Sequence, residues 1–95
     1  MHIISKKALR EFWKQYPNSQ TSLMRWFKLM TKNSFGNFTE LRAVFPSADL
    51  VDGLTVFNIG GNKYRLITSI HFNRGKVYVR GVLTHVEYDT EGWKT

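Results

Sequence analysis

The sequence contains no cysteine, and only two prolines interrupt its 95 residues. Without a thiol, the chain can form neither a disulfide nor a thiolate metal site. A long hydrophobic run is also missing, because residues 1–7 contain only an apolar pair and no other stretch approaches the length of a membrane span. We therefore expect a soluble, cytoplasmic protein that makes no contact with a membrane.

Acidic residues are scarce, with seven Asp and Glu against fourteen Lys and Arg, which gives a formal net charge of +7. Residues 53–86 contain no acidic side chain, and the cations of this stretch are Lys63, Arg65, Arg74, Lys76 and Arg80. A field of this sign attracts polyanions, so nucleic acid is the first partner to consider. An acidic protein surface or an anionic lipid would fit the same composition.

Hydrophobic residues make up 42% of the chain and aromatic residues 15%, which is enough for one modest core. We expect a single domain over residues 1–95 that folds without a metal or another cofactor. The histidines, His2, His71 and His85, show no ligand spacing, and this argues against a metal site.

The first half of the chain has the apolar spacing of amphipathic helices. After an edge strand at residues 1–4, we expect a helix with Ser5 as its N-cap and Pro17 as its stop. A second helix should begin within residues 19–22 and end by residues 33–36. The inward positions of the two helices are Leu9, Phe12, Trp13, Tyr16, Leu23, Trp26, Phe27 and Met30. A helical turn at residues 39–45 and a loop at residues 47–53 complete this half.

From residue 54 onward the hydrophobic period changes to two, which predicts strands at residues 54–59, 63–72 and 76–85. Gly60-Gly61 and Arg74-Gly75 lie between them and predict two-residue turns of an antiparallel meander. Such turns set the register, with these opposite pairs: Asn58 and Lys63, Phe57 and Tyr64, Val56 and Arg65, and Arg80 and Ser69.

Strand alternation separates two faces of this predicted sheet. The core face should hold Phe57, Ile59, Tyr64, Leu66, Ile70, Phe72, Val77, Val79 and Leu83. The other face should hold Asn58, Lys63, Arg65, Ser69, His71 and Arg80, interrupted by Val56 and Ile67. Because the helices cover only the core face, Arg65 and Arg80 should share an open surface.

Two arginines with Lys63 and Asn58 on an uncovered sheet face form a plausible phosphate site, since a guanidinium can bind a phosphodiester through two hydrogen bonds. The alternative is an ordinary solvated face, on which Lys and Arg prevent aggregation. Tyr78 lies in the same strand region and is a candidate for stacking on a base.

The segment T-H-V-E-Y-D, where the last predicted strand ends, contains His85, Tyr88 and Asp89. Imidazole and phenol groups can transfer protons if they project over the arginines. Strict alternation would place His85 on the core face, so a catalytic role requires the chain to bend there. The alternative is a hydrogen-bonded structural histidine.

Several motifs together resemble one family. The runs V-F-N-I-G-G-N-K-Y-R-L-I and V-Y-V-R-G-V-L-T-H-V-E-Y-D are similar to the HigB group of bacterial type II toxins, members of the RelE-like superfamily. The runs K-A-L-R-E-F-W-K-Q-Y-P and L-R-A-V-F-P-S-A-D are similar to the same group, so the resemblance covers nearly the whole chain.

The resemblance implies an α+β, RelE-like fold in which two N-terminal helices pack on a curved antiparallel β-sheet meander. It also implies a metal-independent mRNA interferase, an endoribonuclease that cuts translated mRNA at the ribosomal A site through attack of the ribose 2′-OH on the adjacent phosphate. The implied partners are mRNA, the ribosome and a HigA-like helix-turn-helix antitoxin, with operator DNA bound only through the antitoxin complex.

The site expected from the matching motifs has two parts. The candidate catalytic residues are Arg65 and Arg80 as phosphate clamps, with His85 and Tyr88 as proton-transfer groups. The candidate RNA-binding residues are Asn58, Lys63, Tyr78, Asp89 and Lys94, with Trp93 and Lys94 left open as completing the site or simply ending the chain. Two other functions remain open, a non-catalytic basic module that binds RNA or a protein partner, and a nuclease that acts on DNA or tRNA.

Overall fold

Apolar residues at helical spacing form the two long helices, α1 (Lys6–Gln15) and α2 (Gln20–Lys32). In the computed structural model, which describes residues 1–90, Pro17 opens a 3-10 turn between them, η1 (Pro17–Ser19). Pro cannot supply the amide that would continue α1, so the helix ends as predicted. Ser5 occupies the N-cap position with a φ of 81°, and its side chain makes no capping bond.

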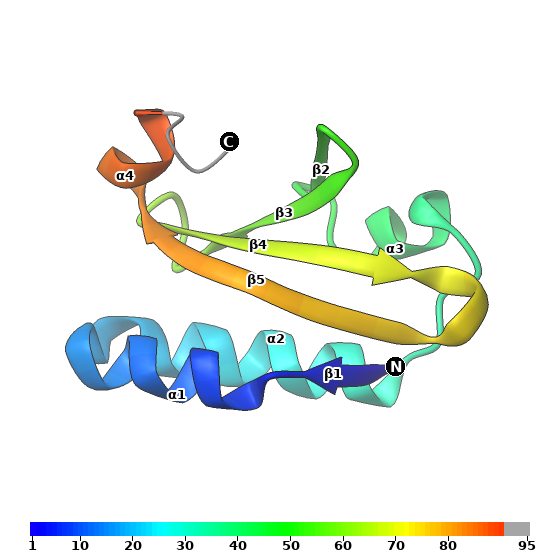
Figure 1. The fold of residues 1–95 in the computed structure, drawn as a ribbon, viewed down its shortest axis with the longest axis horizontal. Coiled ribbons are helices and arrows are strands. Elements are labelled where there is room, and N and C mark those ends of the chain that lie inside the picture. The colour runs from blue at the N-terminus through cyan, green and yellow to red at the C-terminus, as the bar shows by residue number, and fades with distance from the viewer. Residues whose placement is uncertain (91–95) are drawn as a thin grey trace.

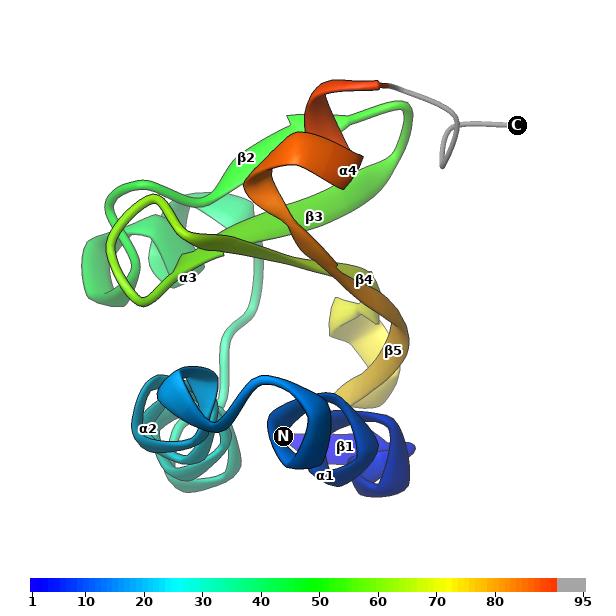
Figure 2. The ribbon, with the colours of Figure 1, turned by 90° about the vertical axis from the view of Figure 1, so that its left-hand side faces the viewer.

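The strands form one mixed five-stranded sheet of order β1-β5-β4-β3-β2. Their bounds are β1 (His2–Ile4), β2 (Asp49–Val51), β3 (Leu54–Ile59), β4 (Tyr64–His71) and β5 (Lys76–Thr84). The predicted edge strand is present as β1, but it pairs in parallel with β5, whereas the other pairs are antiparallel. Figures 1 and 2 show α1 and α2 side by side on one face of this curved sheet.

The core lies between the two long helices and the sheet, with a third helix, α3 (Phe38–Val44), at its margin. Leu9, Leu23 and Leu66 are fully buried, and Trp26 contacts the ring of Phe57 edge-on. The predicted α+β class with two N-terminal helices on the sheet is therefore confirmed. No helix within residues 1–90 has the length and apolar character needed to cross a bilayer.

The loop expected at residues 47–53 is wrong, because Asp49–Val51 is a strand that pairs with the start of β3. Asp52 and Gly53 form the connection, and both have positive φ values, 51° and 79°. These values suit the tight two-residue turn that Asp-Gly favours in hairpins. The Asp-Gly pair was therefore a hairpin signal.

The expected register between β3 and β4 is also wrong. Asn58 lies opposite Arg65 and Ile59 opposite Tyr64, because the turn spans residues 60–63 rather than the glycine pair alone. Lys63 N donates to Gly60 O and closes this longer turn. The turn is two residues longer than expected, and because this is an even number, every side chain keeps the face that alternation gave it.

Arg80 does not lie opposite Ser69, which pairs instead with Tyr78. The turn before β5 is longer than Arg74-Gly75, since it includes the 3-10 turn η2 (Phe72–Arg74). A bulge then follows, because Ile67 pairs with Gly81 and Thr68 with Val79, and Arg80 has no partner across β4. The bulge resets the alternation.

Leu83 is therefore not a core residue, contrary to expectation. It pairs with Arg65 and lies on the face away from α1 and α2, while Val82 pairs with Leu66 and packs against the core. We call this second face the open face. The residues that pairing, alternation and the bulge place on it are Asp49, Val51, Leu54, Val56, Asn58, Arg65, Ile67, Ser69, His71, Lys76, Tyr78, Arg80, Gly81 and Leu83.

Candidate functional site

A short helix that the strand pattern did not predict, α4 (His85–Asp89), follows β5 directly. Thr84 is its N-cap and forms a capping box with Glu87. Glu87 N donates to Thr84 Oγ1 at 3.2 Å, and Thr84 N donates to Glu87 Oε1 at 2.9 Å. The reciprocal bonds satisfy amides that the first turn leaves without partners. The chain therefore bends away from the strand at His85.

This bend also ties α4 to the turn between β3 and β4. His85 N donates to Lys63 O at 2.9 Å, so the first residue of the helix is fixed to the residue that precedes β4. The catalytic use of His85 required such a bend, and the side chain is exposed rather than directed into the core. Figure 1 shows α4 at the end of β5, on the side of the sheet opposite α1 and α2.

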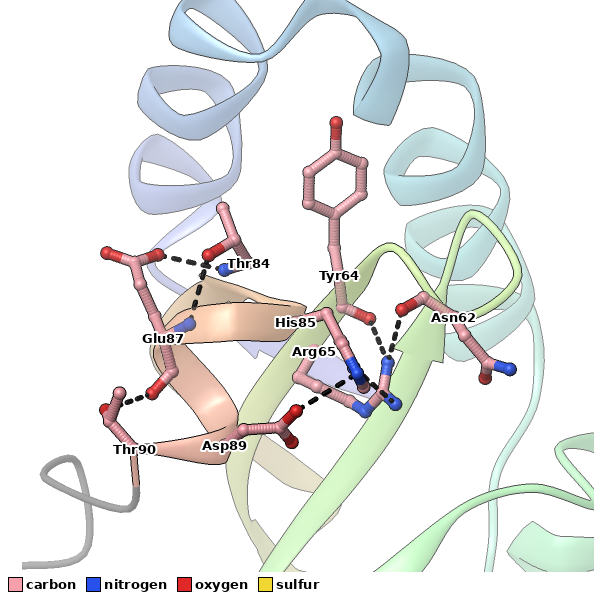
Figure 3. A network of polar contacts seen from close by, with 8 residues as sticks. All are labelled: Asn62, Tyr64, Arg65, Thr84, His85, Glu87, Asp89 and Thr90. Carbon is pink, nitrogen blue, oxygen red and sulfur yellow. Dashed lines mark hydrogen bonds and ion pairs between the residues drawn. The ribbon is translucent and has the colours of Figure 1, made fainter.

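Arg65 is half-buried at the start of β4 and is held in place by backbone carbonyls. Its Nη1 donates to Asn62 O at 3.1 Å and to Tyr64 O at 3.2 Å, and its Nη2 lies 3.3 Å from His85 Nδ1 (Figure 3). A guanidinium has five N–H donors, so these three bonds leave two for an incoming anion. The side chain is positioned before any ligand arrives.

His85 lies between a cation and a carboxylate, and this fixes its tautomer. Arg65 can only donate, so Nδ1 of His85 must accept the bond from Nη2. The proton then sits on Nε2, which lies 3.0 Å from Asp89 Oδ2 and donates to it. In this arrangement the Nδ1 lone pair of His85 is directed at Arg65, and Asp89 orients the ring (Figure 3).

Tyr88 completes the group from the same helix. The Arg65 guanidinium carbon lies 5.4 Å from the centre of the Tyr88 ring, within the range of a cation–π contact. Four sequence-predicted residues are therefore gathered where β4 meets α4, and we call them the Arg65 cluster: Arg65, His85, Tyr88 and Asp89.

The other predicted residues lie outside this cluster. Lys63 and Asn58 are exposed at the adjacent turn, where Asn58 Nδ2 donates to Asn62 Oδ1 at 3.4 Å. Arg80 lies at the bulge, roughly 10 Å along β5 from Leu83, the partner of Arg65. Tyr78 lies farther along β5, its ring 5.2 Å from that of His71.

Lys94 and Trp93 fall outside the residues that the structure describes. Among the described residues, the expectation missed Asn62, whose carbonyl holds Arg65, and the pair Thr84 and Glu87, which forms α4. The spacing Thr-x-x-Glu is the capping-box pattern, so the sequence did carry a signal for α4. No comparable pattern marks a backbone carbonyl such as that of Asn62.

The Arg65 cluster combines an anion-binding group with a proton acceptor at hydrogen-bond distance. A phosphate that binds Arg65 through Nη2 and draws this nitrogen away from His85 would release the Nδ1 lone pair. Asp89 would then stabilise the imidazolium that forms when Nδ1 takes a proton. The geometry therefore suits chemistry in which a proton is removed next to a bound phosphate.

Loss of the capping box should loosen the cluster. We expect Thr84→Ala to weaken α4 by about 1 kcal/mol, the usual cost of losing a Ser or Thr cap. Amide hydrogen exchange at Glu87 should then become roughly fivefold faster, because that energy corresponds to a fivefold change in the open population. Thr84→Ser is the control, since it keeps the hydroxyl. Equal exchange in both variants would show that the cap does not hold α4.

The comparisons with known proteins agree with each other. Residues 19–91 match a family described as HigB_toxin, RelE-like toxic component of a toxin-antitoxin system. The chain is 40% identical over 92 residues to the mRNA interferase toxin HigB of Escherichia coli (strain K12), which covers 94% of this chain and 88% of that protein. The mRNA interferase HigB of Escherichia coli O6:H1 is 33% identical over 92 residues, covering 94% and 89%. The span matched by the family includes the whole Arg65 cluster.

Proposed function

Because the chain belongs to the HigB family of RelE-like toxins, we propose that it is an mRNA interferase, an endoribonuclease that inhibits translation by cutting messenger RNA. The 95 residues act as one toxin domain, in the cytoplasm, where messages are translated. The single observation that carries the proposal is the Arg65 cluster, which joins a phosphate-binding cation to a histidine–carboxylate pair beside an open sheet face.

Arg65 binds the phosphate at which the RNA is cut. Its carbonyl partners, Asn62 O and Tyr64 O, hold one side of the guanidinium while the remaining donors bind phosphate oxygens. A cation fixed in this way stabilises the negative charge that grows on the phosphorane, and no reorganisation is needed at the moment of reaction.

His85 and Tyr88 transfer the protons. His85 Nδ1 takes the proton of the ribose 2′-OH, whose oxygen then attacks the adjacent phosphorus. The bond from phosphorus to the 5′-oxygen breaks, and the Tyr88 hydroxyl gives that oxygen its proton, so the products are a 2′,3′-cyclic phosphate and a 5′-hydroxyl. Asp89 acts on His85 rather than on RNA, by holding the tautomer that leaves Nδ1 unprotonated.

Four other sequence-predicted residues, Lys63, Asn58, Arg80 and Tyr78, guide the RNA. Lys63 and Asn58, exposed at the turn next to Arg65, bind the backbone on one side of the cut. Arg80 binds the RNA backbone on the other side of the cut. Tyr78 lies about 20 Å from Thr84 along β5, so any base that it stacks on belongs to a more distant nucleotide.

The family is described as the toxic component of a toxin–antitoxin system, which implies an antitoxin partner. We propose that this antitoxin is HigA-like, with a helix-turn-helix domain, and that the complex rather than the toxin alone binds operator DNA. We also propose that cleavage takes place at the ribosomal A site. The formal charge of +7 favours association with ribosomal RNA and with a message held there.

Induced expression in bacteria tests the proposed function. The expected result is growth arrest together with cut messages, whose ends are located by sequencing. Growth arrest with intact messages would favour a non-catalytic RNA-binding module, and cuts confined to tRNA or DNA would favour the other nuclease. Purified protein and message, mixed with or without ribosomes, then test the A-site proposal. If cleavage depends on the ribosome, the message is cut only when ribosomes are present.

A further inference from the structure

A hollow of about 190 Å³ lies on the open face beside the Arg65 cluster. Three strands contribute its lining, which consists of Leu54, Ile67, Arg80, Gly81 and Leu83. Apart from the Arg80 guanidinium, no side chain in this lining carries a polar atom. The hollow therefore joins an apolar floor to one cationic edge.

The bulge in β5 creates this hollow. Because Arg80 is the extra residue, Gly81 lies opposite Ile67 and the alternation after it directs Leu83 to the open face. Gly81 places no side chain beside Ile67, which is itself only 4% exposed. A Cβ at Gly81 would meet no other heavy atom within 4 Å, apart from those of its chain neighbours.

Any residue with a side chain at position 81 would direct that side chain to the open face, into this space. The φ of Gly81 is not positive, in contrast to Gly53, Gly60, Gly61 and Gly75. The backbone therefore does not require glycine here, and what the missing side chain provides is room.

The chemistry of the lining indicates the ligand. A flat ring fits an apolar floor, and a ring edge with hydrogen-bond acceptors fits Arg80, which can also stack on the ring. Pockets for drug-sized ligands measure roughly 300–1,000 Å³, so this hollow accommodates one small ring system rather than a whole nucleotide. These properties match a nucleobase.

The position of the hollow relates it to the cut. Leu83 lines it and is also the strand partner of Arg65, and Gly81 lies roughly 7 Å away along the same strand. A nucleotide whose phosphate binds Arg65 can direct its own base, or that of its neighbour, into this space. We propose that the hollow binds one unstacked nucleobase beside the cleaved phosphate and selects where the message is cut. This inference rests on the proposed mRNA interferase function.

The test fills the hollow without touching the Arg65 cluster. Wild-type protein and Gly81→Val are compared in a translation reaction on a message of mixed sequence, and the cut ends are sequenced. The wild type should prefer particular bases at one fixed position from the cut. Gly81→Val should lower kcat/KM at the preferred sites by roughly tenfold and flatten that preference, since one or more methyl groups in an apolar pocket changes discrimination by this amount.

Ser69→Val is the matched control, because it adds a comparable side chain to the open face on the neighbouring strand, opposite Tyr78 and outside the hollow. Its base preference should equal that of the wild type. Leu83→Ala enlarges the hollow and should broaden the preference. Gly81→Ala serves as a smaller substitution if circular dichroism shows that Gly81→Val does not fold.

The outcomes separate the two proposals. If the wild type cuts with a base preference that folded Gly81→Val or Gly81→Ala leaves unchanged, the base-binding hollow is wrong and the interferase function stands. If the wild type cuts RNA without any base preference, the base-binding hollow is also wrong and the interferase function also stands. If the wild type does not cut RNA at all, the proposed function fails, and the base-binding role fails with it.

Discussion

Arg65→Ala is expected to reduce RNA cleavage by roughly a hundredfold or more while leaving the fold intact. Removal of a donor that stabilises charge in a transition state costs on the order of 3 kcal/mol, which corresponds to this loss of rate. The loss should appear mainly in kcat, since the guanidinium binds the phosphorane more strongly than the phosphate of the substrate.

Arg65 also holds Asn62 O and Tyr64 O, so a structural effect must be distinguished from a catalytic one. Thermal unfolding followed by circular dichroism measures the structural part, which should be small because the side chain is half-buried. Arg65→Lys keeps the charge but loses the fork of donors, and it should recover only part of the activity.

Arg10→Ala is the matched control, because Arg10 is an exposed arginine of α1 and its loss changes the net charge by the same amount. It should keep nearly full activity. Equal activity losses in Arg10→Ala and Arg65→Ala would show that Arg65 contributes only general electrostatic attraction. Full activity in Arg65→Ala would remove this residue from the site.

His85→Ala is expected to lower kcat by about 10² to 10⁴, the usual contribution of a positioned acid or base. Its effect on stability should be minor, because His85 is exposed and its structural bond to Lys63 O comes from the backbone. Single-turnover cleavage with saturating protein measures the chemical step apart from RNA binding.

Asp89→Asn should have a smaller effect than His85→Ala, because Asp89 acts through the orientation of His85. His71→Ala is the matched control, since His71 is an exposed histidine at the other end of the open face. If His85→Ala retained wild-type kcat, proton transfer would have to come from another group, and Tyr88→Phe would be the next variant to measure.

Much of the sheet could be predicted from the sequence because residues two apart in a strand lie on the same face. The face of each side chain is therefore unchanged when a turn is longer than expected by an even number of residues. Phe57, Ile59 and Leu66 were therefore assigned to the core correctly although the turn length was wrong. Turn length itself could not be predicted from Gly-Gly, because Asn62 and Lys63 fit a longer turn equally well. The position of Arg65 on the open face did not depend on that length.

The bulge limited the prediction in β5. Glycine is uncommon in strand interiors, so the isolated Gly81 in V-Y-V-R-G-V-L was a sign of a bulge that the strand prediction did not use. The effect of the bulge reached Leu83, which was wrongly placed in the core. Predicting α4 was possible in principle, since Thr84 and Glu87 form a recognisable capping box, but the apolar residues before them favoured a continuing strand.

Because α4 is small, the candidate site can be less stable than the domain as a whole. A helix of five residues is far below the length at which helices are stable alone, so its persistence depends on the Thr84–Glu87 box and on the bond between His85 N and Lys63 O. Neither end of this arrangement is buried in the core. As the protein warms, α4 can open locally while the sheet and long helices remain folded. On the proposed mechanism, RNA cleavage should then be lost reversibly at a temperature below that at which the molecule melts.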